Sequence, residues 1–156
     1  MACTYHVASS ENLDLLVQMR VEFIQDMHPE YSDEKMKERR SGVEAYVATQ
    51  YASGSYIGFW GENDGTVVCS GALLVYHLPP LNGKEGRKIG HVLNFFTRKE
   101  HRKKGYGLGL MSFMKEYARD HGFSRLFLNA TEDGYPLYVK AGYTDANRAM
   151  EFNIEP

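Results

Sequence analysis

The sequence predicts a mixed α/β fold with one largely antiparallel sheet and helices packed on its faces. Two β-prone runs flank the dipeptide Asp64-Gly65, a strong hairpin signal, so the middle of the chain is expected to be antiparallel. Further on, a strand pattern, a glycine-rich turn, an amphipathic helix pattern and another strand pattern follow in that order, which indicates one βαβ unit. A length of 156 residues favours a single domain over residues 1–156.

The first half of the chain carries one strand pattern, two helical patterns and the hairpin. Apolar residues at helical spacing follow the cap candidates Ser9, Ser10 and Asn12, and they predict the first helix. The second helix has a thinner apolar face, so we expect it to be partly exposed. The predicted elements are a strand over Thr4–Ala8, a helix that stops before Pro29, a helix from Ser32 or Asp33 to about Ala52, and a hairpin that turns at Asp64-Gly65 and ends at Pro79.

The second half alternates strand and helix patterns. Glycines follow two of its helical patterns at the positions where a left-handed residue ends a helix. The predicted elements are a polar loop over residues 81–88, a strand over Ile89–Thr97, a helix that Gly122 ends, a strand over Ser124–Ala130, a short helix that Gly142 ends, and a last strand over Ala149–Ile154.

Composition and charge are those of an ordinary globular protein. Hydrophobic residues make up 43% of the chain, charged residues 24%, and the formal net charge at pH 7 is −2. This balance does not favour a nucleic-acid partner or a membrane surface. No apolar run reaches the roughly 18 residues of a membrane-span candidate. We therefore expect neither nucleic acid nor membrane as a partner.

The two cysteines, Cys3 and Cys69, form no disulfide framework, and the sequence shows no metal-ligand spacing. Cys69 stands in an apolar run and is expected to be a buried free thiol. The N-terminal residues lack the basic and apolar regions of a signal peptide. These observations predict a cytoplasmic protein without a metal site.

The stretch RKEHRKKGYGLGL, residues 98–110, lies between a predicted strand and a predicted helix. Backbone N–H groups at a helix start lack intrahelical acceptors, and the helix dipole adds positive potential, so such a start favours phosphate. Gly105, Gly107 and Gly109 are expected to allow positive φ and close approach of a ligand. Mobile positive charge is expected from four side chains, namely Arg98, Arg102, Lys103 and Lys104. The stretch therefore predicts a phosphate-bearing ligand.

The common nucleotide motifs do not match this stretch. The P-loop spacing is absent, and Leu110 stands where the dinucleotide fingerprint requires its last glycine. The protein-kinase motifs have no counterpart either.

The hexapeptide RKKGYG, Arg102–Gly107, resembles the R/Q-x-x-G-x-G/A signature of the GNAT N-acetyltransferase superfamily. The segment PLYVKAGY, Pro136–Tyr143, is similar to that family's LYxKxGF segment, and the order of elements agrees from Thr4 to Phe152. The resemblance, to small bacterial-type members, implies the GNAT fold: a mixed, mostly antiparallel sheet with splayed central strands and flanking helices.

The resemblance implies acetyl-CoA as acyl donor, with its pyrophosphate on backbone amides of Arg102, Lys103, Lys104, Gly105, Tyr106 and Gly107. The strand that ends at Thr97 and the one that ends near Asn129 would splay apart. Pantetheine would lie between them and pair with the backbone of Phe95, Phe96 and Thr97. The family commonly has an Asn where this chain has Thr131. Either Thr131 or Asn129 would therefore contact the cofactor.

Acyl transfer to an amine needs a neutral amine, a donor to the thioester carbonyl, and a proton for the departing thiolate. The resemblance implies that a backbone N–H near Phe96 polarises the carbonyl and that Tyr138 is the general acid. Without the resemblance, Tyr138 would be read as a core tyrosine on a short helix. Many relatives place a carboxylate where this chain has Asn94, which cannot act as a base. The base stays open between a water chain and six side chains, namely Glu22, Asp26, His77, His91, Glu132 and Asp133.

The acceptor is expected to be a primary amine of a small molecule or a protein, acetylated by direct attack in a ternary complex. Its specificity is expected from the first two helices, the loop over residues 79–90 and the C-terminal strands. The alternative function is a non-catalytic acyl-CoA binding or sensing module on the same fold. Strands at the C-terminal edge of the sheet also allow a homodimer.

Overall fold

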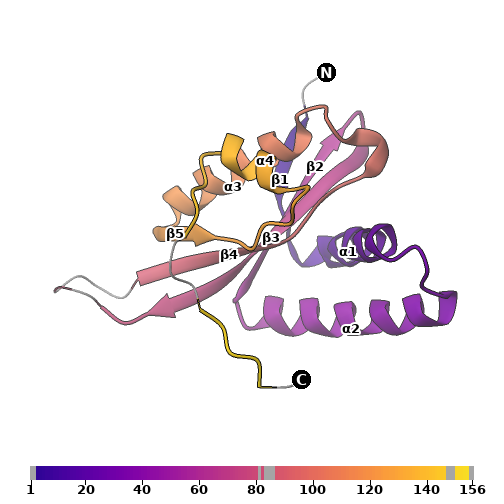
Figure 1. The fold of residues 1–156 in the computed structure, drawn as a ribbon, viewed down its shortest axis with the longest axis horizontal. Coiled ribbons are helices and arrows are strands. Elements are labelled where there is room, and N and C mark those ends of the chain that lie inside the picture. Colours follow the sequence, from indigo (N-terminus) through magenta and orange to yellow (C-terminus); the bar gives the residue numbers. More distant parts are fainter. Residues whose placement is uncertain (1–2, 81, 83–86, 147–149, 155–156) are drawn as a thin grey trace.

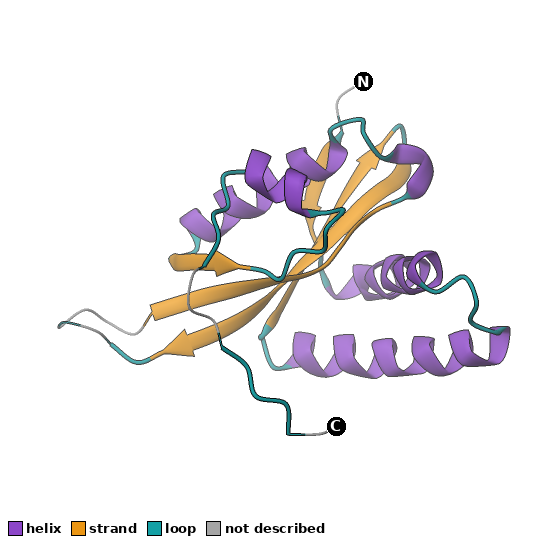
Figure 2. Cartoon of the chain, in the orientation of Figure 1, coloured by secondary structure: helices purple, strands orange, loops and turns teal. Residues whose placement is uncertain are grey.

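The computed structural model describes residues 3–80, 82, 87–146 and 150–154 (Figure 1). One five-stranded sheet in the order β1-β2-β3-β4-β5 runs through the molecule. Helices α1 and α2 lie on one side of this sheet, and α3 and α4 lie on the other side (Figures 1 and 2). The elements are β1 (Thr4–Val7), α1 (Leu13–Met27), α2 (Asp33–Ala52), β2 (Tyr56–Asn63), β3 (Thr66–Leu78), β4 (Arg87–Thr97), α3 (Tyr106–Asp120), β5 (Phe123–Phe127) and α4 (Tyr135–Lys140), with 3₁₀ turns η1 (Ser10–Asn12) and η2 (Lys99–His101).

The sheet is mixed, as the sequence predicts. Strands β1 to β4 pair antiparallel with their neighbours, and only β5 pairs parallel, with β4. Helix α3 connects these two strands, so β4, α3 and β5 form the expected βαβ unit. The predicted α/β fold class is confirmed.

Local signals set several element ends. The Ser32 hydroxyl accepts a hydrogen bond from the Lys35 N–H at 3.2 Å, which makes Ser32 the N-cap of α2. Asp64 and Gly65 both have positive φ, at 52° and 74°, as a two-residue hairpin turn requires. Helix α1 ends at Met27, ahead of Pro29, because the residue before a proline disfavours helical geometry.

Hydrophobic side chains form a core on each side of the sheet. Between the sheet and α3 lies a cluster that includes Phe59, Leu110 and Met114, all fully buried. Between the sheet and the pair α1 and α2 lies a second cluster around Leu16, Val47 and other buried side chains. Cys69 is wholly buried and free, as predicted, and burial raises its pKa to about 12.

The C-terminal strand prediction is wrong. Residues 150–154 have no strand pairing, while Ala149 lies outside the described residues. Met150, Phe152 and Ile154 are 96%, 89% and 90% exposed, so no neighbouring strand among the described residues covers the side of the segment that carries them. Alternation indicates which side chains share a face, but it does not supply a pairing partner.

Two further predicted boundaries differ from the structure. Strand β5 ends at Phe127 and not at Ala130. Arg87 and Lys88, expected in the polar loop, begin β4, whereas residues 81 and 83–86 of that loop lie outside the described residues. Within the part of the chain that the structure describes, none of the helices has both the length and the apolar character of a membrane span.

Candidate active site

Strands β4 and β5 run side by side for only part of their length. Their pairing ends where His91 lies opposite Phe127, the last residue of β5. Strand β4 continues to Thr97 with β3 as its neighbour. The backbone over residues 92–97 therefore has an edge that β5 leaves open, and the splayed strands expected from the family resemblance are present.

Strand β4 carries a bulge at this opening. Two residues, Asn94 and Phe95, stand between the pairs that Leu93 and Phe96 make with β3, where β3 has a single residue. Asn94 has φ of 54°, a left-handed conformation that Asn adopts more readily than most non-glycine residues. The bulge locally re-aims the side chains of β4.

The residues at the bulge divide between the two faces of the sheet. Phe95 packs against the core under α3. The Phe96 ring lies 5.4 Å from that of Phe23 on α1. The Asn94 side-chain amide donates a hydrogen bond to the Tyr56 hydroxyl at 3.3 Å, on the side of α1 and α2. The open edge of β4 therefore lies between the face of the sheet that packs against α3 and the face that packs against α1 and α2.

The start of α3 lies beside the end of β4. Gly105 is the N-cap with φ of 86°, and Lys103 is also left-handed with φ of 62°. Within the described residues, no acceptor is recorded for the backbone N–H groups of residues 103–107. A side chain at Gly105 would meet nothing within 4 Å, so the backbone of this residue is open to a ligand. Free amides and the helix dipole make this turn suited to an anion.

The three glycines of the motif have different roles. Only Gly105 has positive φ. A side chain at Gly107 would meet Leu137 at 3.1 Å and Thr97 at 3.2 Å, and one at Gly109 would meet the Tyr5 ring. Gly107 and Gly109 lie inside α3 and do not use the positive φ that glycine allows; close packing is what excludes a larger residue there.

Two of the four basic side chains expected to be mobile are bound to the protein. The Arg98 guanidinium binds both carboxylate oxygens of Glu22, at 2.7 and 2.8 Å, and the Val67 carbonyl at 2.7 Å. Arg102 binds Asp26 on α1 and also the Thr97 carbonyl, at 3.0 Å. Both side chains hold the loop to α1, so mobile positive charge is left to two exposed lysines, Lys103 and Lys104.

Tyr138 lies on α4 and faces the bulge. Its ring is 6.0 Å from that of Phe95, in an edge-on arrangement. Burial raises the pKa of Tyr138, so its hydroxyl keeps its proton at neutral pH. Thr131 accepts a hydrogen bond from the Gly134 N–H at 3.2 Å and so shapes the turn before α4, and both Thr131 and Asn129 are exposed.

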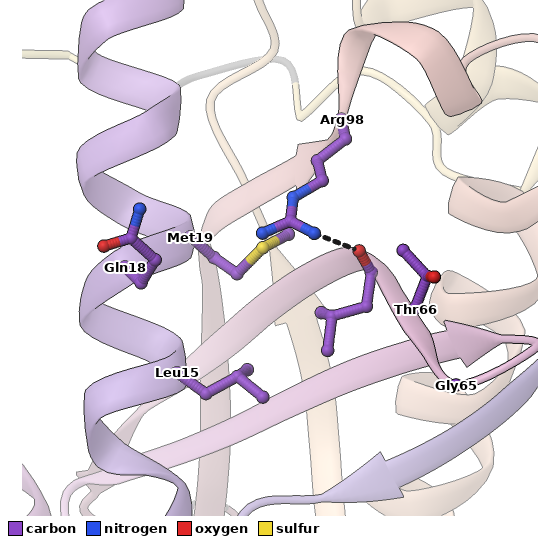
Figure 3. Close-up of a pocket in the computed structure, with 7 residues that line it drawn as sticks. Leu15, Gln18, Met19, Gly65, Thr66 and Arg98 are labelled. Atoms are coloured by element: carbon purple, nitrogen blue, oxygen red, sulfur yellow. Dashed lines mark hydrogen bonds between the residues drawn. The ribbon is translucent and has the colours of Figure 1, made fainter.

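Two hollows adjoin these elements. One, of about 940 Å³, is lined by β5, α3 and α4 and includes Asn129 and Tyr138. Another, of about 380 Å³, lies between α1 and the turn from β2 to β3, and Arg98 forms part of its wall (Figure 3). The first hollow brings together two of the residues expected at the cofactor. Beside the second hollow, Arg98 connects α1 to the sheet, because it binds both Glu22 and the Val67 carbonyl.

The GNAT acetyltransferase family model matches residues 16–143, most of the chain. The chain belongs to this family. None of the curated proteins compared with the chain matches it.

Solved structures of other acetyltransferases share the fold of this family member. A predicted acetyltransferase from Clostridium acetobutylicum, crystallised with acetyl-CoA, is 22% identical with a TM-score of 0.79, over 98% of this chain and 97% of that chain. A GCN5-related N-acetyltransferase from Ralstonia eutropha JMP134 is 22% identical with a TM-score of 0.77, over 99% and 100%. An aminoglycoside acetyltransferase from an uncultured soil metagenomic sample is 22% identical with a TM-score of 0.73, over 100% and 99%.

In this family member, two of the candidate bases are engaged elsewhere. Glu22 and Asp26 form ion pairs with Arg98 and Arg102. Burial alone would raise the pKa of Glu22, but hydrogen bonds from Arg98 and Gln18 outweigh it and the pKa is lowered. Because both carboxylates are bound to arginines of the loop, neither residue is placed as the base.

His91 lies at the point where β4 and β5 part. Its ring stacks on Phe127 with the ring centres 4.5 Å apart, and burial lowers its pKa. A lowered pKa increases the neutral imidazole near pH 7, which is the form that accepts a proton. The remaining candidates, His77, Glu132 and Asp133, are exposed.

Sequence reasoning missed the bulge and the contacts between α1 and the loop. An Asn between Leu93 and Phe95 is a weak bulge signal, because Asn is rare in strands and tolerates positive φ. The pairs Glu22–Arg98 and Asp26–Arg102 each join residues 76 positions apart, so local patterns do not reveal them.

Proposed function

We propose that this family member is an N-acetyltransferase that transfers the acetyl group of acetyl-CoA to a primary amine of a small molecule or protein, by direct attack in a ternary complex. One observation carries the proposal: beyond His91, β4 has an edge that β5 leaves open, and β4 then leads into a helix start whose amides have no acceptor within the described residues. An extended thioester with a diphosphate at one end fits this combination. The two free cysteines, Cys3 and Cys69, support a reducing, cytoplasmic location.

The free amides would hold the pyrophosphate. The N–H groups of Arg102, Lys103, Lys104, Gly105, Tyr106 and Gly107 surround the turn into α3. That of Arg102 already bonds to the Lys99 carbonyl at 3.3 Å, so residues 103–107 supply the unengaged donors. Lys103 and Lys104 add exposed positive charge.

The open edge of β4 would pair with pantetheine through the backbone of Phe95, Phe96 and Thr97. Asn129 is better placed than Thr131 to add a side-chain contact. Asn129 lies in the wall of the 940 Å³ hollow, whereas Thr131 is not one of the residues that line it. The side chain of Asn129 would therefore contact the cofactor.

The protein would then promote the attack of a neutral amine on the thioester through three groups, which are a backbone N–H, a proton donor and a proton acceptor. A backbone N–H near Phe96 polarises the thioester carbonyl, which favours the formation of the C–N bond. Tyr138 gives its proton to the sulfur as the C–S bond breaks, and its raised pKa keeps that proton available. The proton lost by the amine goes to His91 or to solvent.

A specific observation favours the second candidate, an acyl-CoA binding or sensing module. Asn94 stands where relatives place a carboxylate, and the two nearby carboxylates on α1 are ion-paired. A sensor would bind acyl-CoA and transfer nothing. Turnover therefore separates the two candidates.

Thermal unfolding with acetyl-CoA tests the cofactor, and an amine panel read by release of free CoA tests turnover. Acetyl-CoA should raise the Tm, whereas N-acetylcysteamine acetate, a thioester without the diphosphate, should raise it much less. An aminoglycoside belongs in the panel because one structural neighbour is an aminoglycoside acetyltransferase. An unchanged Tm with acetyl-CoA would contradict the proposal, and a raised Tm without turnover of any amine would support the sensor.

A further inference from the structure

The side of the sheet under α1 and α2 carries a set of polar and aromatic side chains next to the bulge. We call it the acceptor-face cluster, and its members are Arg20, Tyr46, Tyr56, Tyr76, His91, Asn94 and Phe127. Ring contacts join its aromatic members in two groups: Tyr46 lies 6.2 Å from Tyr56, and Phe127 lies 6.2 Å from Tyr76 and 4.5 Å from His91. Tyr46 and Tyr76 are 39% and 41% exposed and form the outer part of the cluster, whereas Tyr56 is 4% exposed and lies at its inner end.

Arg20 is the cation of this cluster. Its guanidinium lies 4.9 Å from the centre of the Phe23 ring and is half-buried. Among the described residues, no carboxylate is recorded within 4.0 Å of it, whereas Arg98 and Arg102 on the same side each bind one. Burial lowers the pKa of Arg20, which reflects the cost of holding its charge away from water.

Tyr56 supplies a second donor near the bulge: Arg20 lies over Phe23, which contacts Phe96, and Tyr56 contacts Asn94. Its hydroxyl oxygen accepts the hydrogen bond from Asn94, so its own O–H is left to donate. Within the described residues no acceptor is recorded for this O–H. Burial raises the pKa of Tyr56, so the hydroxyl stays protonated.

A half-buried guanidinium and a phenol O–H without acceptors form a site for an anion. Guanidinium binds carboxylate or phosphate through two parallel hydrogen bonds, and burial strengthens the interaction. Asn94, which contacts Tyr56, precedes Phe95 and Phe96 at the open edge of β4. An anion at Arg20 and Tyr56 would therefore be close to the proposed position of the thioester.

We propose that the acceptor is an amine that also carries an anionic group, a carboxylate or phosphate, and that Arg20 and Tyr56 bind this group. The inference rests on the proposed acetyl transfer and narrows its substrate class. The anion would set the distance from the amine to the thioester carbon, so Arg20 and Tyr56 would determine specificity.

Matched amines test the inference. Each L-amino acid is compared with its carboxamide, and phosphoethanolamine is compared with ethanolamine, by the kcat/KM of CoA release. The wild-type protein should prefer the anionic member of at least one pair. The pair that shows this preference tells whether the site binds a carboxylate or a phosphate. Arg20→Gln should lower kcat/KM for that member by about thirtyfold or more and leave the neutral member little changed.

Two further variants keep the test independent of folding. Tyr56→Phe removes only the O–H and should weaken the same preference, and Arg39→Gln on the exposed part of α2 should preserve it. Stabilisation of each variant by acetyl-CoA shows that the donor side is intact. Equal use of anionic and neutral amines would overturn the inference while acetyl transfer itself still stands, whereas release of CoA from neither class would support the sensor and overturn both the inference and the proposed transfer. Loss of that response in wild-type protein would instead overturn the proposed function.

Discussion

Glu22 on α1 receives two hydrogen bonds from the Arg98 guanidinium, at 2.7 and 2.8 Å, and so joins this helix to the residue that follows β4. The side chains are 30% and 25% exposed, so water screens the pair only in part. The same guanidinium binds the Val67 carbonyl, which adds β3 to the junction.

Removal of this junction should destabilise the protein. Glu22→Ala leaves a partly buried guanidinium without its carboxylate, and we expect the free energy of unfolding to fall by about 1–3 kcal/mol. Urea unfolding measures the change. Glu44→Ala is the control, because the Arg40–Glu44 pair is exposed with 3.9 Å between charged atoms and should contribute less than about 1 kcal/mol. Equal effects from both substitutions would show that the junction is unimportant.

The Glu22 junction should also make stability depend on pH. The folded protein lowers the pKa of Glu22 from an ordinary value of 4.5, so the unfolded chain binds this proton more readily. The stabilisation is therefore complete above pH 4.5 and is lost as the pH falls through the lower folded-state pKa. The difference in unfolding free energy between wild type and Glu22→Gln should shrink toward acid pH, and a constant difference would contradict this assignment.

Two helical glycines should respond in opposite directions to alanine. At Gly109, a methyl group would collide with the Tyr5 ring, so Gly109→Ala should lower the free energy of unfolding by about 1–3 kcal/mol. At Gly42 in α2, a methyl group would meet nothing within 4 Å, so Gly42→Ala should raise it by about 0.5–1 kcal/mol. Thermal and urea unfolding report both changes. A neutral Gly109→Ala would mean that Tyr5 moves aside at little cost.

Tyr138→Phe should separate chemistry from binding. The phenyl ring keeps the packing against Phe95, but the proton for the departing thiolate is lost, so kcat should fall about a hundredfold or more. The Kd for acetyl-CoA, measured by calorimetry, should hardly change. Tyr135→Phe is the control on the same helix, because its hydroxyl faces Asp145. An unaltered kcat in Tyr138→Phe would remove this residue from the mechanism.

The features that the sequence predicts correctly depend on neighbours along the chain. Asp64 and Gly65 set the hairpin by themselves, Ser32 caps α2 through a residue three positions on, and Gly105 starts α3 in the conformation that glycine favours. The resemblance of two short motifs then indicates the family and, through it, the splayed strands.

The features that escaped prediction depend on pairing over long distances. The register of β3 against β4 creates the bulge at Asn94, and the fold brings Glu22 to Arg98. The basic stretch therefore looked more mobile than it is. The apolar alternation of Met150, Phe152 and Ile154 predicted a strand, although the described residues provide no strand beside it.

The two ion pairs of α1 link the proposed cofactor side of the site to the proposed acceptor side. Glu22 and Asp26 attach the helix to the loop that leads into α3, and Arg20, within the same two turns, faces the acceptor-face cluster. A shift of that loop on binding of a diphosphate would therefore move α1 and, with it, the Arg20 guanidinium. Thermodynamic linkage makes such an effect mutual, so the first ligand to bind and the second would change each other's affinity by the same factor.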